Sequence, residues 1–129
     1  MKKLIQLKRG DEAVETVMAR CLEWGVETAS VHGIGATNKA RLGFYDPSRG
    51  TYETFEVDEQ MEVVSLTGNV TQRKGRPHIH LHAVLSDSSF GVRGGHVHSL
   101  IADPVLEIAI IESDEKKVRR GEGPILLFD

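Results

Sequence analysis

The stretch GRPHIHLHAVLSD, residues 75–87, decides how this chain is expected to fold. Histidine occupies every second position at its centre, as His78, His80 and His82. Side chains two residues apart in a β-strand point to the same face of a sheet, and their neighbours point to the other face. The three imidazoles therefore share one face, and the apolar residues between them share the opposite one. We expect a strand whose apolar face belongs to a core.

Two further histidines follow in GVRGGHVHSLI, residues 91–101. The intervening SDSSFG favours a hairpin in which His96 lies opposite His82, and the same register puts His98 opposite His80. Cβ atoms of cross-strand neighbours are about 5 Å apart, and zinc–imidazole bonds are about 2.0–2.1 Å long. Three of these rings could therefore converge on one metal ion. A bulge at the glycine pair before His96 would shift this register and send that ring to the wrong side.

A histidine patch without a metal is the alternative interpretation. Buried imidazoles without partners would cost free energy, and exposure to solvent gives no reason for the rings to cluster. We therefore favour a metal site over a solvated or hydrogen-bonded patch. An all-nitrogen ligand set suits zinc, copper, nickel or iron, and zinc is the default. His32, which stands alone on an earlier run, is interpreted as a polar surface residue.

Upstream of these segments, residues 11–25 have the pattern of an amphipathic helix. Apolar residues recur at helical spacing, Asp11 is suited to cap the amino-terminal end, and Gly25 suits the left-handed residue that ends a helix. Cys21 is the only cysteine, so no internal disulfide can form. We interpret it as a small buried hydrophobe rather than as a nucleophile.

The rest of the chain consists of short runs rich in Val, Ile, Thr and Tyr, which favour β-strands. Turn signals divide these runs: DPSRG, DEQ, RKGRP, SDSSFG and ADP. About seven strands with one long helix predict a single domain over residues 1–129. It is of the α+β class, with a curved and mostly antiparallel sheet. The predicted strands after the helix are 26–35, 39–45, 51–57, 62–70, 77–85, 91–101 and 105–112.

The charge balance limits the partners. The chain has 16 Lys and Arg against 19 Asp and Glu, a net charge of -3, which argues against bulk attraction to nucleic acid or to anionic membranes. A local basic patch could still bind DNA. No run of about 18 apolar residues predicts a membrane span, and the apolar stretch near the amino terminus ends too soon for a signal peptide. We expect a cytoplasmic protein that does not bind membranes.

The chain contains, in this order, the segments SVHGIGATNKARLGFYD, MEVVSLTGNV, PHIHLHAVLSD, GVRGGHV and VLEIAI. Their order and spacing resemble the PPC domain, the plants-and-prokaryotes conserved domain, over about residues 4–127. The resemblance implies an α+β fold that assembles as a homotrimer. Plant members are joined to AT-hook segments that bind AT-rich DNA, and they mediate protein–protein association. Prokaryotic members are usually this domain alone and are often labelled as DNA-binding proteins.

The resemblance also implies roles for the histidines. His80, His82 and His96 occupy the positions at which prokaryotic members are metal-competent, so we expect them to bind zinc or another divalent transition metal. His78 and His98 are less regular in the family, and we expect them to support the ligands. Plant members that lack these histidines keep the fold, so the site is a feature of this branch.

Two basic segments bear on DNA binding. RKGRP, residues 73–77, contains the Gly-Arg-Pro core of an AT-hook, which inserts arginines into a narrow minor groove. Arg73, Lys74 and Arg76 are therefore the candidate DNA contacts. A hairpin loop explains the same residues, and we favour it over a hook. The second basic segment, KKVRRGEG at residues 116–123, is interpreted as a solvated turn.

Three classes of function stay open. The first is a metal-binding, trimer-forming domain with a regulatory or DNA-associated role. The second is a zinc-dependent enzyme acting on a small molecule, because three histidines leave one coordination position open. Glu53 or Glu107 could supply its general base, but the glutamate of a cupin-like site is missing, since AVLSD follows His82. The third is a purely structural assembly module with an incidental metal. The apolar tail PILLFD, residues 124–129, could pack against the sheet or against another subunit.

Overall fold

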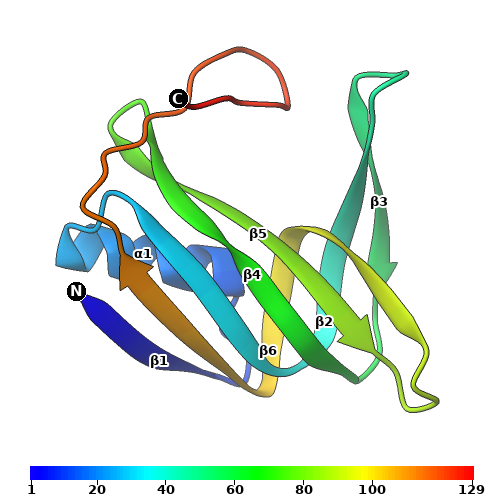
Figure 1. Ribbon diagram of the computed structural model, residues 1–129. Helices are drawn as coiled ribbons and strands as arrows, with labels where there is room; N and C mark the ends of the chain where they lie inside the picture. Colours follow the sequence, from blue (N-terminus) through cyan, green and yellow to red (C-terminus); the bar gives the residue numbers. More distant parts are fainter.

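The computed structural model describes all 129 residues and contains one helix and six strands (Figure 1). Every pairing between these strands is antiparallel, which confirms the α+β class and the antiparallel sheet. The helix lacks the length and the apolar character that crossing a membrane requires. In chain order the elements are β1 (Lys2–Lys8), α1 (Ala13–Trp24), β2 (Ala29–Asp46), β3 (Thr51–Val57), β4 (Met61–Arg73), β5 (Arg76–Ser86) and β6 (Val92–Glu112).

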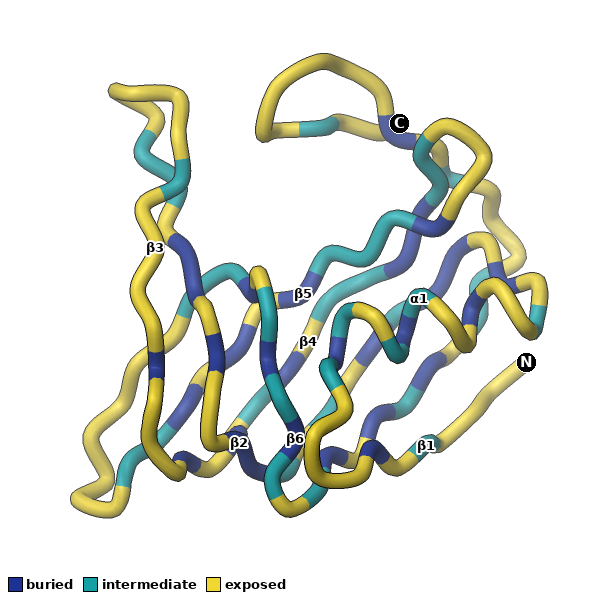
Figure 2. The backbone as a smooth tube through the Cα atoms, turned by 180° about the vertical axis from the view of Figure 1, so that it is seen from behind, coloured by how far each residue is buried: buried dark blue, intermediate teal, exposed yellow.

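The strands form one sheet in the order β1-β6-β5-β4-β2-β3, and an additional pairing joins β6 to β2. The neighbours β2, β4, β5 and β6 thus close into a ring. The two longest strands change partner along their length. β2 pairs first with β4 and then with β3, whereas β6 pairs first with β5 and later with β1. These changes of partner accompany the strong curvature of the sheet, which is visible from both sides (Figure 1, Figure 2).

The sequence predicts about seven strands because turn-like segments divide two strands that are continuous in the structure. The predicted strands 26–35 and 39–45 both fall in β2, and the predicted strands 91–101 and 105–112 both fall in β6. The expected break in β2 is an irregularity of the β2–β6 ladder, whose register shifts on both sides of Thr37. A bulge bends a strand without ending its pairing. The turn-like ADP segment therefore lies inside a strand.

The helix α1 ends as predicted but begins differently. Gly25 adopts a left-handed φ of 68° and closes the last turn. The amino-terminal cap is Glu12 rather than Asp11, because the longer carboxylate reaches two amides of the first turn, at 2.8 and 3.0 Å. The same carboxylate accepts a hydrogen bond from the amide of Leu100 in β6 at 2.9 Å, which ties the helix to the sheet. Asp11 instead accepts from the amide of Lys8.

The core is one cluster of 23 buried apolar residues that joins α1 to the sheet. Along β5, the buried Leu81 and Ala83 alternate with the histidines, as the period of two predicts. Figure 2 shows buried positions alternating with more exposed ones along the strands. Cys21 belongs to this core, and its burial raises the pKa of its thiol to about 11. The thiol therefore stays protonated and unreactive at neutral pH, which confirms the prediction of a buried hydrophobe.

The strands β4 and β5 approach each other closely beside His80, and a glycine permits this approach. Gly68 of β4 pairs with Leu81 of β5. A Cβ atom on Gly68 would collide with the carbonyl oxygen of His80 and would lie 2.9 Å from the Cα atom of Leu81. Both atoms belong to the backbone, which cannot move aside without disturbing the ladder. Glycine is therefore required at this position.

Replacing Gly68 with alanine is expected to force β4 away from β5 and to lower the free energy of unfolding by about 2–3 kcal/mol, the scale of overpacking a filled site. Urea denaturation of metal-free wild type and variant measures this difference. Thr67→Ala, at the preceding exposed position of β4, is the control and should change the value by less than about 0.5 kcal/mol. An unchanged unfolding midpoint for Gly68→Ala would show that the two strands are not packed this closely.

Candidate metal centre

Two strands bring three histidines together. In the β5–β6 ladder His82 lies directly opposite His96, the register that the hairpin predicts. His80 precedes His82 by two residues on β5. The candidate ligand nitrogens of the three imidazoles all lie within 4.8 Å of one another, and Nε2 of His80 is 3.2 Å from Nε2 of His82. We call His80, His82 and His96 the histidine trio.

The other two clustered histidines lie beside the trio. The sequence predicts His98 opposite His80, and this pairing is wrong, because the β5–β6 ladder reaches no further along β6 than the trio. Just beyond that point β6 pairs with β2, and His98 falls where the register of this second ladder shifts. The His98 ring packs edge-on against Tyr52 of β3, with ring centroids 5.1 Å apart. His78 lies near the start of β5, half-buried, on the side of His80 away from His82.

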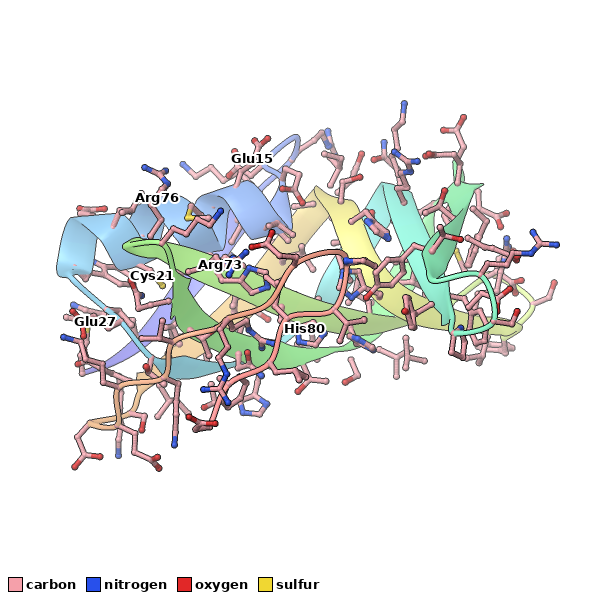
Figure 3. The ribbon with its side chains drawn as sticks, turned by 90° about the horizontal axis from the view of Figure 1, so that it is seen from above. Glu15, Cys21, Glu27, Arg73, Arg76 and His80 are labelled. Carbon is pink, nitrogen blue, oxygen red and sulfur yellow. The ribbon has the colours of Figure 1, made fainter.

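A small hollow of about 80 Å³ adjoins the trio. The sheet lines it with His78, with two members of the trio and with Tyr52. The C-terminal segment, residues 113–129, lines it with Arg119 and the apolar residues 124–126. Figure 1 shows this segment arching above the sheet, and Figure 3 shows it from above, passing over β5 beside His80. The hollow therefore depends on residues that lie far apart in the sequence.

Arg119 is the residue at this site that sequence reasoning misses. The KKVRRGEG segment is predicted to be a solvated turn, which holds for Arg120 but is wrong for Arg119, only 8 % exposed. The Arg119 guanidinium donates to the side-chain oxygens of Thr71 at 2.8 Å and Asn69 at 3.0 Å, and to the carbonyl oxygen of Leu126 at 3.0 Å. No local pattern distinguishes the two adjacent arginines, because the partners on β4 stand about fifty residues earlier.

No carboxylate neutralises the charge of Arg119. The neighbouring Arg120 pairs with Asp129, whereas Arg119 takes part in none of the ion pairs. Its Nη2 atom lies 3.4 Å from Nδ1 of His80. A buried cation therefore stands against one member of the trio. An unpaired buried charge is costly, and its three short hydrogen bonds offset part of that cost.

Burial lowers the pKa of four clustered imidazoles, those of His78, His80, His96 and His98. It is the largest cause that lowers the pKa of His96, to about 4, and the neighbouring histidines lower this pKa further. Burial and then the charge of Arg119 lower the pKa of His80. Burial is also the first cause of the lowered pKa values of His78 and His98. These rings are neutral at pH 7, and a neutral imidazole has the free nitrogen that a metal ion needs.

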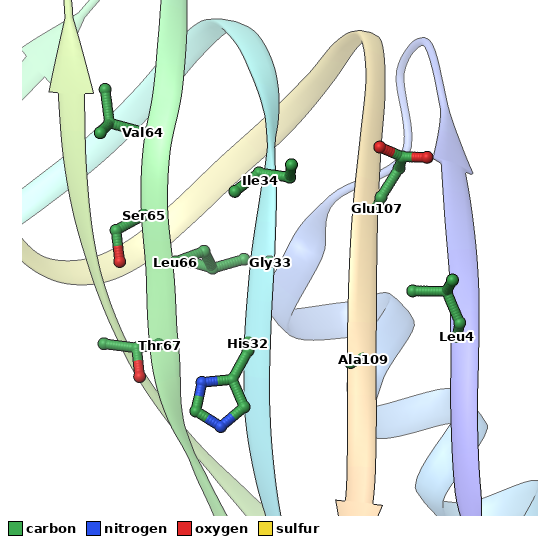
Figure 4. Close-up of a pocket in the computed structure, with 10 residues that line it drawn as sticks. All are labelled: Leu4, His32, Gly33, Ile34, Val64, Ser65, Leu66, Thr67, Glu107 and Ala109. Atoms are coloured by element: carbon green, nitrogen blue, oxygen red, sulfur yellow. The ribbon is translucent and has the colours of Figure 1, made fainter.

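The carboxylates considered as general bases stand elsewhere. None lines the hollow beside the trio. Glu53 lies on the β3 hairpin, with its carboxylate 3.5 Å from the guanidinium of Arg49. Glu107 lines a separate, wider hollow of about 510 Å³ on the sheet face (Figure 4). His32 lines this wider hollow too and is exposed, as predicted for a polar surface residue outside the cluster.

The candidate DNA contacts Arg73, Lys74 and Arg76 belong to the tight turn between β4 and β5. Lys74 and Gly75 have φ angles of 51° and 76°, as in the two-residue turns that connect hairpin strands. Arg73 lies opposite Arg76 in the ladder, so the hairpin interpretation is confirmed. The Arg73 guanidinium donates to the carbonyl oxygen of Gly121 at 2.8 Å, whereas Lys74 and Arg76 are exposed.

A small α+β domain with a strongly curved sheet and a surface trio of histidines is the class that this fold and site define. The model of the Plants and Prokaryotes Conserved (PCC) domain family matches residues 2–114. The chain therefore belongs to this family, also written PPC, as the resemblance implied. No curated protein matches the chain.

Three solved structures are similar over almost the whole chain, each at 28% sequence identity. A "putative DNA binding protein" from Bacteroides thetaiotaomicron has a TM-score of 0.94, over 99% of this chain and 91% of that one. A metal-containing protein from Archaeoglobus fulgidus has a TM-score of 0.90, over 99% and 92%. A plant- and prokaryote-conserved (PPC) protein from Pyrococcus horikoshii has a TM-score of 0.89, over 95% and 85%.

Proposed function

We propose that this chain is a metal-binding PPC domain in which the histidine trio holds one divalent transition metal ion, zinc by default. We further propose that it acts as a homotrimer in a regulatory or DNA-associated role. The observation that carries the metal proposal is the spacing of three neighbouring imidazoles whose candidate ligand nitrogens lie within 4.8 Å of one another. The description of the A. fulgidus relative as a metal-containing protein supports it.

The trio fits a tetrahedral ion. With zinc–nitrogen bonds of about 2.0–2.1 Å, two nitrogens bound to one tetrahedral ion lie about 3.3–3.4 Å apart. The 3.2 Å between Nε2 of His80 and Nε2 of His82 is close to this value before any metal binds. The candidate nitrogen of His96 lies within 4.8 Å of the other two, so it would have to approach them by no more than about 1.5 Å. The ligand set also suits copper, nickel or iron.

Metal analysis of protein purified without a histidine tag is expected to find close to one divalent ion per chain. His80→Ala should remove most of it, because two remaining imidazoles bind an ion far more weakly than three. His32→Ala changes a histidine that is exposed and outside the trio, and as the matched control it should keep the metal. Stoichiometric metal that persists after all three members of the trio are replaced by alanine would refute the assignment.

A zinc-dependent enzyme acting on a small molecule is the second candidate function. The hollow of about 80 Å³ beside the trio favours it, because a ligand there could reach the position that three histidines leave open. Bound zinc would supply a Lewis acid at that position. The lining contains no carboxylate, so His78 is the one lining residue outside the trio that could accept a proton. For this reason the enzyme stays the alternative to the metal-binding domain.

Two apolar surfaces support self-association. On the sheet face, Leu4, Ile34 and Val64 are 76%, 57% and 54% exposed and surround the wider hollow (Figure 4). In the tail, Leu127 and Phe128 are exposed as well. Contiguous exposed apolar residues are typical of surfaces that bind another protein. A homotrimer is the assembly that the family resemblance implies.

Light scattering at micromolar concentration is expected to give a mass near three times 14.3 kDa. If the sheet face is the interface, a variant with both Ile34→Asp and Val64→Asp should dissociate, because buried unpaired carboxylates are costly. Thr54→Asp adds a charge to an exposed position of β3 and should leave the mass unchanged. A wild-type protein that is monomeric under these conditions would contradict the homotrimer.

Any affinity for DNA must come from a local patch, because the net charge is -3. Arg73, Lys74 and Arg76, repeated three times around a trimer, are the candidates. Binding through phosphates falls steeply with salt, so we expect weak or no binding to duplex DNA near physiological salt. Salt-sensitive binding to AT-rich duplex that disappears when all three are replaced by alanine would overturn this expectation. Lys116→Ala with Lys117→Ala, in the other basic segment, is the control.

A further inference from the structure

Metal binding would add positive charge beside the buried guanidinium of Arg119, which has no carboxylate partner. An imidazole binds a metal ion in its neutral form, so the trio would leave both positive charges of a divalent ion uncompensated, next to a buried guanidinium that has no acidic partner. No carboxylate lines the hollow that both would share. Protein groups therefore supply no negative charge between the two cations.

Metal binding would also remove one hydrogen-bond acceptor of Arg119. Its Nη2 atom faces Nδ1 of His80 at 3.4 Å. Nε2 of His80 faces His82, and a neutral imidazole that binds a metal through Nε2 carries its hydrogen on Nδ1. That nitrogen then cannot accept from Arg119. Binding of a metal would thus leave one guanidinium N–H without an acceptor, on the wall of the hollow.

We propose that a small carboxylate binds between the metal and Arg119. One of its oxygens occupies the coordination position left open by the trio, and the other accepts a hydrogen bond from the Arg119 guanidinium. This inference rests on the proposed metal site and names the class of ligand that completes it. Arg119 then acts as a specificity-determining residue, because its planar N–H donors match the geometry of a carboxylate.

The size and lining of the hollow restrict the ligand further. The volume of about 80 Å³ is small beside the roughly 300–1,000 Å³ of pockets that hold drug-sized ligands. It therefore favours a small carboxylate of a few heavy atoms. The apolar residues 124–126 of the C-terminal segment form part of the wall. They suit the carbon end of such a ligand better than the fully polar surface of a phosphate.

The test uses cobalt(II) in place of the native ion, because its visible absorption reports changes in coordination. Metal-free protein is loaded with cobalt and titrated with sodium acetate at constant ionic strength, and in parallel with inorganic phosphate. We expect a saturable spectral change with acetate. Arg119→Met should weaken acetate binding at least tenfold, the effect of losing a charge-assisted hydrogen bond. Arg120→Met, which removes the exposed neighbouring arginine, should change it less than twofold.

A second measurement needs only the wild-type protein. Because coupling is reciprocal, acetate should tighten cobalt binding by the same factor by which cobalt tightens acetate binding. The absence of an acetate response in cobalt-loaded wild type, or a response to phosphate alone, overturns the proposal. Equal acetate affinity of wild type and folded Arg119→Met does so too. Failure of the metal site itself is seen separately, as the absence of cobalt absorption before any acetate is added.

Discussion

The pairing of His82 with His96 is the interaction on which the candidate site depends. It is the terminal one of the five residue pairs that join β5 to β6. Beyond it, β6 continues along β2 and later also pairs with β1. A shift of one residue in this ladder would turn His96 toward the core and disperse the trio. On the other edge of β5, Gly68 lets β4 approach beside His80. Backbone register, rather than long flexible side chains, therefore sets the spacing of the imidazoles.

The rings do not need a metal to be satisfied. Nε2 atoms of His80 and His82 lie 3.2 Å apart, so that one ring can donate to the other, and no buried side-chain nitrogen or oxygen lacks a hydrogen-bond partner. The fold can therefore form first and offer a nearly complete site. That the fold does not require the histidines themselves stays a prediction. The unpaired charge of Arg119 is what a metal-free site leaves unbalanced.

The sequence is a good guide wherever the signal is local. The alternation in β5, the opposition of His82 and His96, the left-handed Gly25 and the hairpin at Arg73–Arg76 all follow from short patterns. The errors arise where distant segments decide. The sequence predicts four strands where the structure has two long ones, β2 and β6. A bulge resembles a turn when the partner strand is unknown. The sequence places His98 opposite the wrong strand for a related reason, because the β5–β6 ladder stops before His98 and β6 continues along β2.

The burial of Arg119 is the clearest example of a feature that neighbouring residues in the sequence do not predict. Arg119 stands in a basic run beside an exposed arginine, yet its side chain is buried. Its guanidinium donates hydrogen bonds to the side chains of Thr71 and Asn69 on β4. Only the closed sheet brings these residues together. An electrostatic feature of the site, its uncompensated positive charge, is therefore invisible in the sequence. The histidines themselves are visible there, because strand periodicity is enough to put them on one face.

The central claim, that backbone register alone preassembles a three-imidazole metal site, can be tested most directly by crystallography. Crystals of the zinc-loaded protein would be measured with X-rays just above and just below the zinc absorption edge. The account predicts one anomalous peak per chain, at about 2.0–2.1 Å from one nitrogen each of His80, His82 and His96, with the β5–β6 register unchanged. A zinc peak bound by fewer than three of these imidazoles, or a peak at another place on the chain, would contradict it.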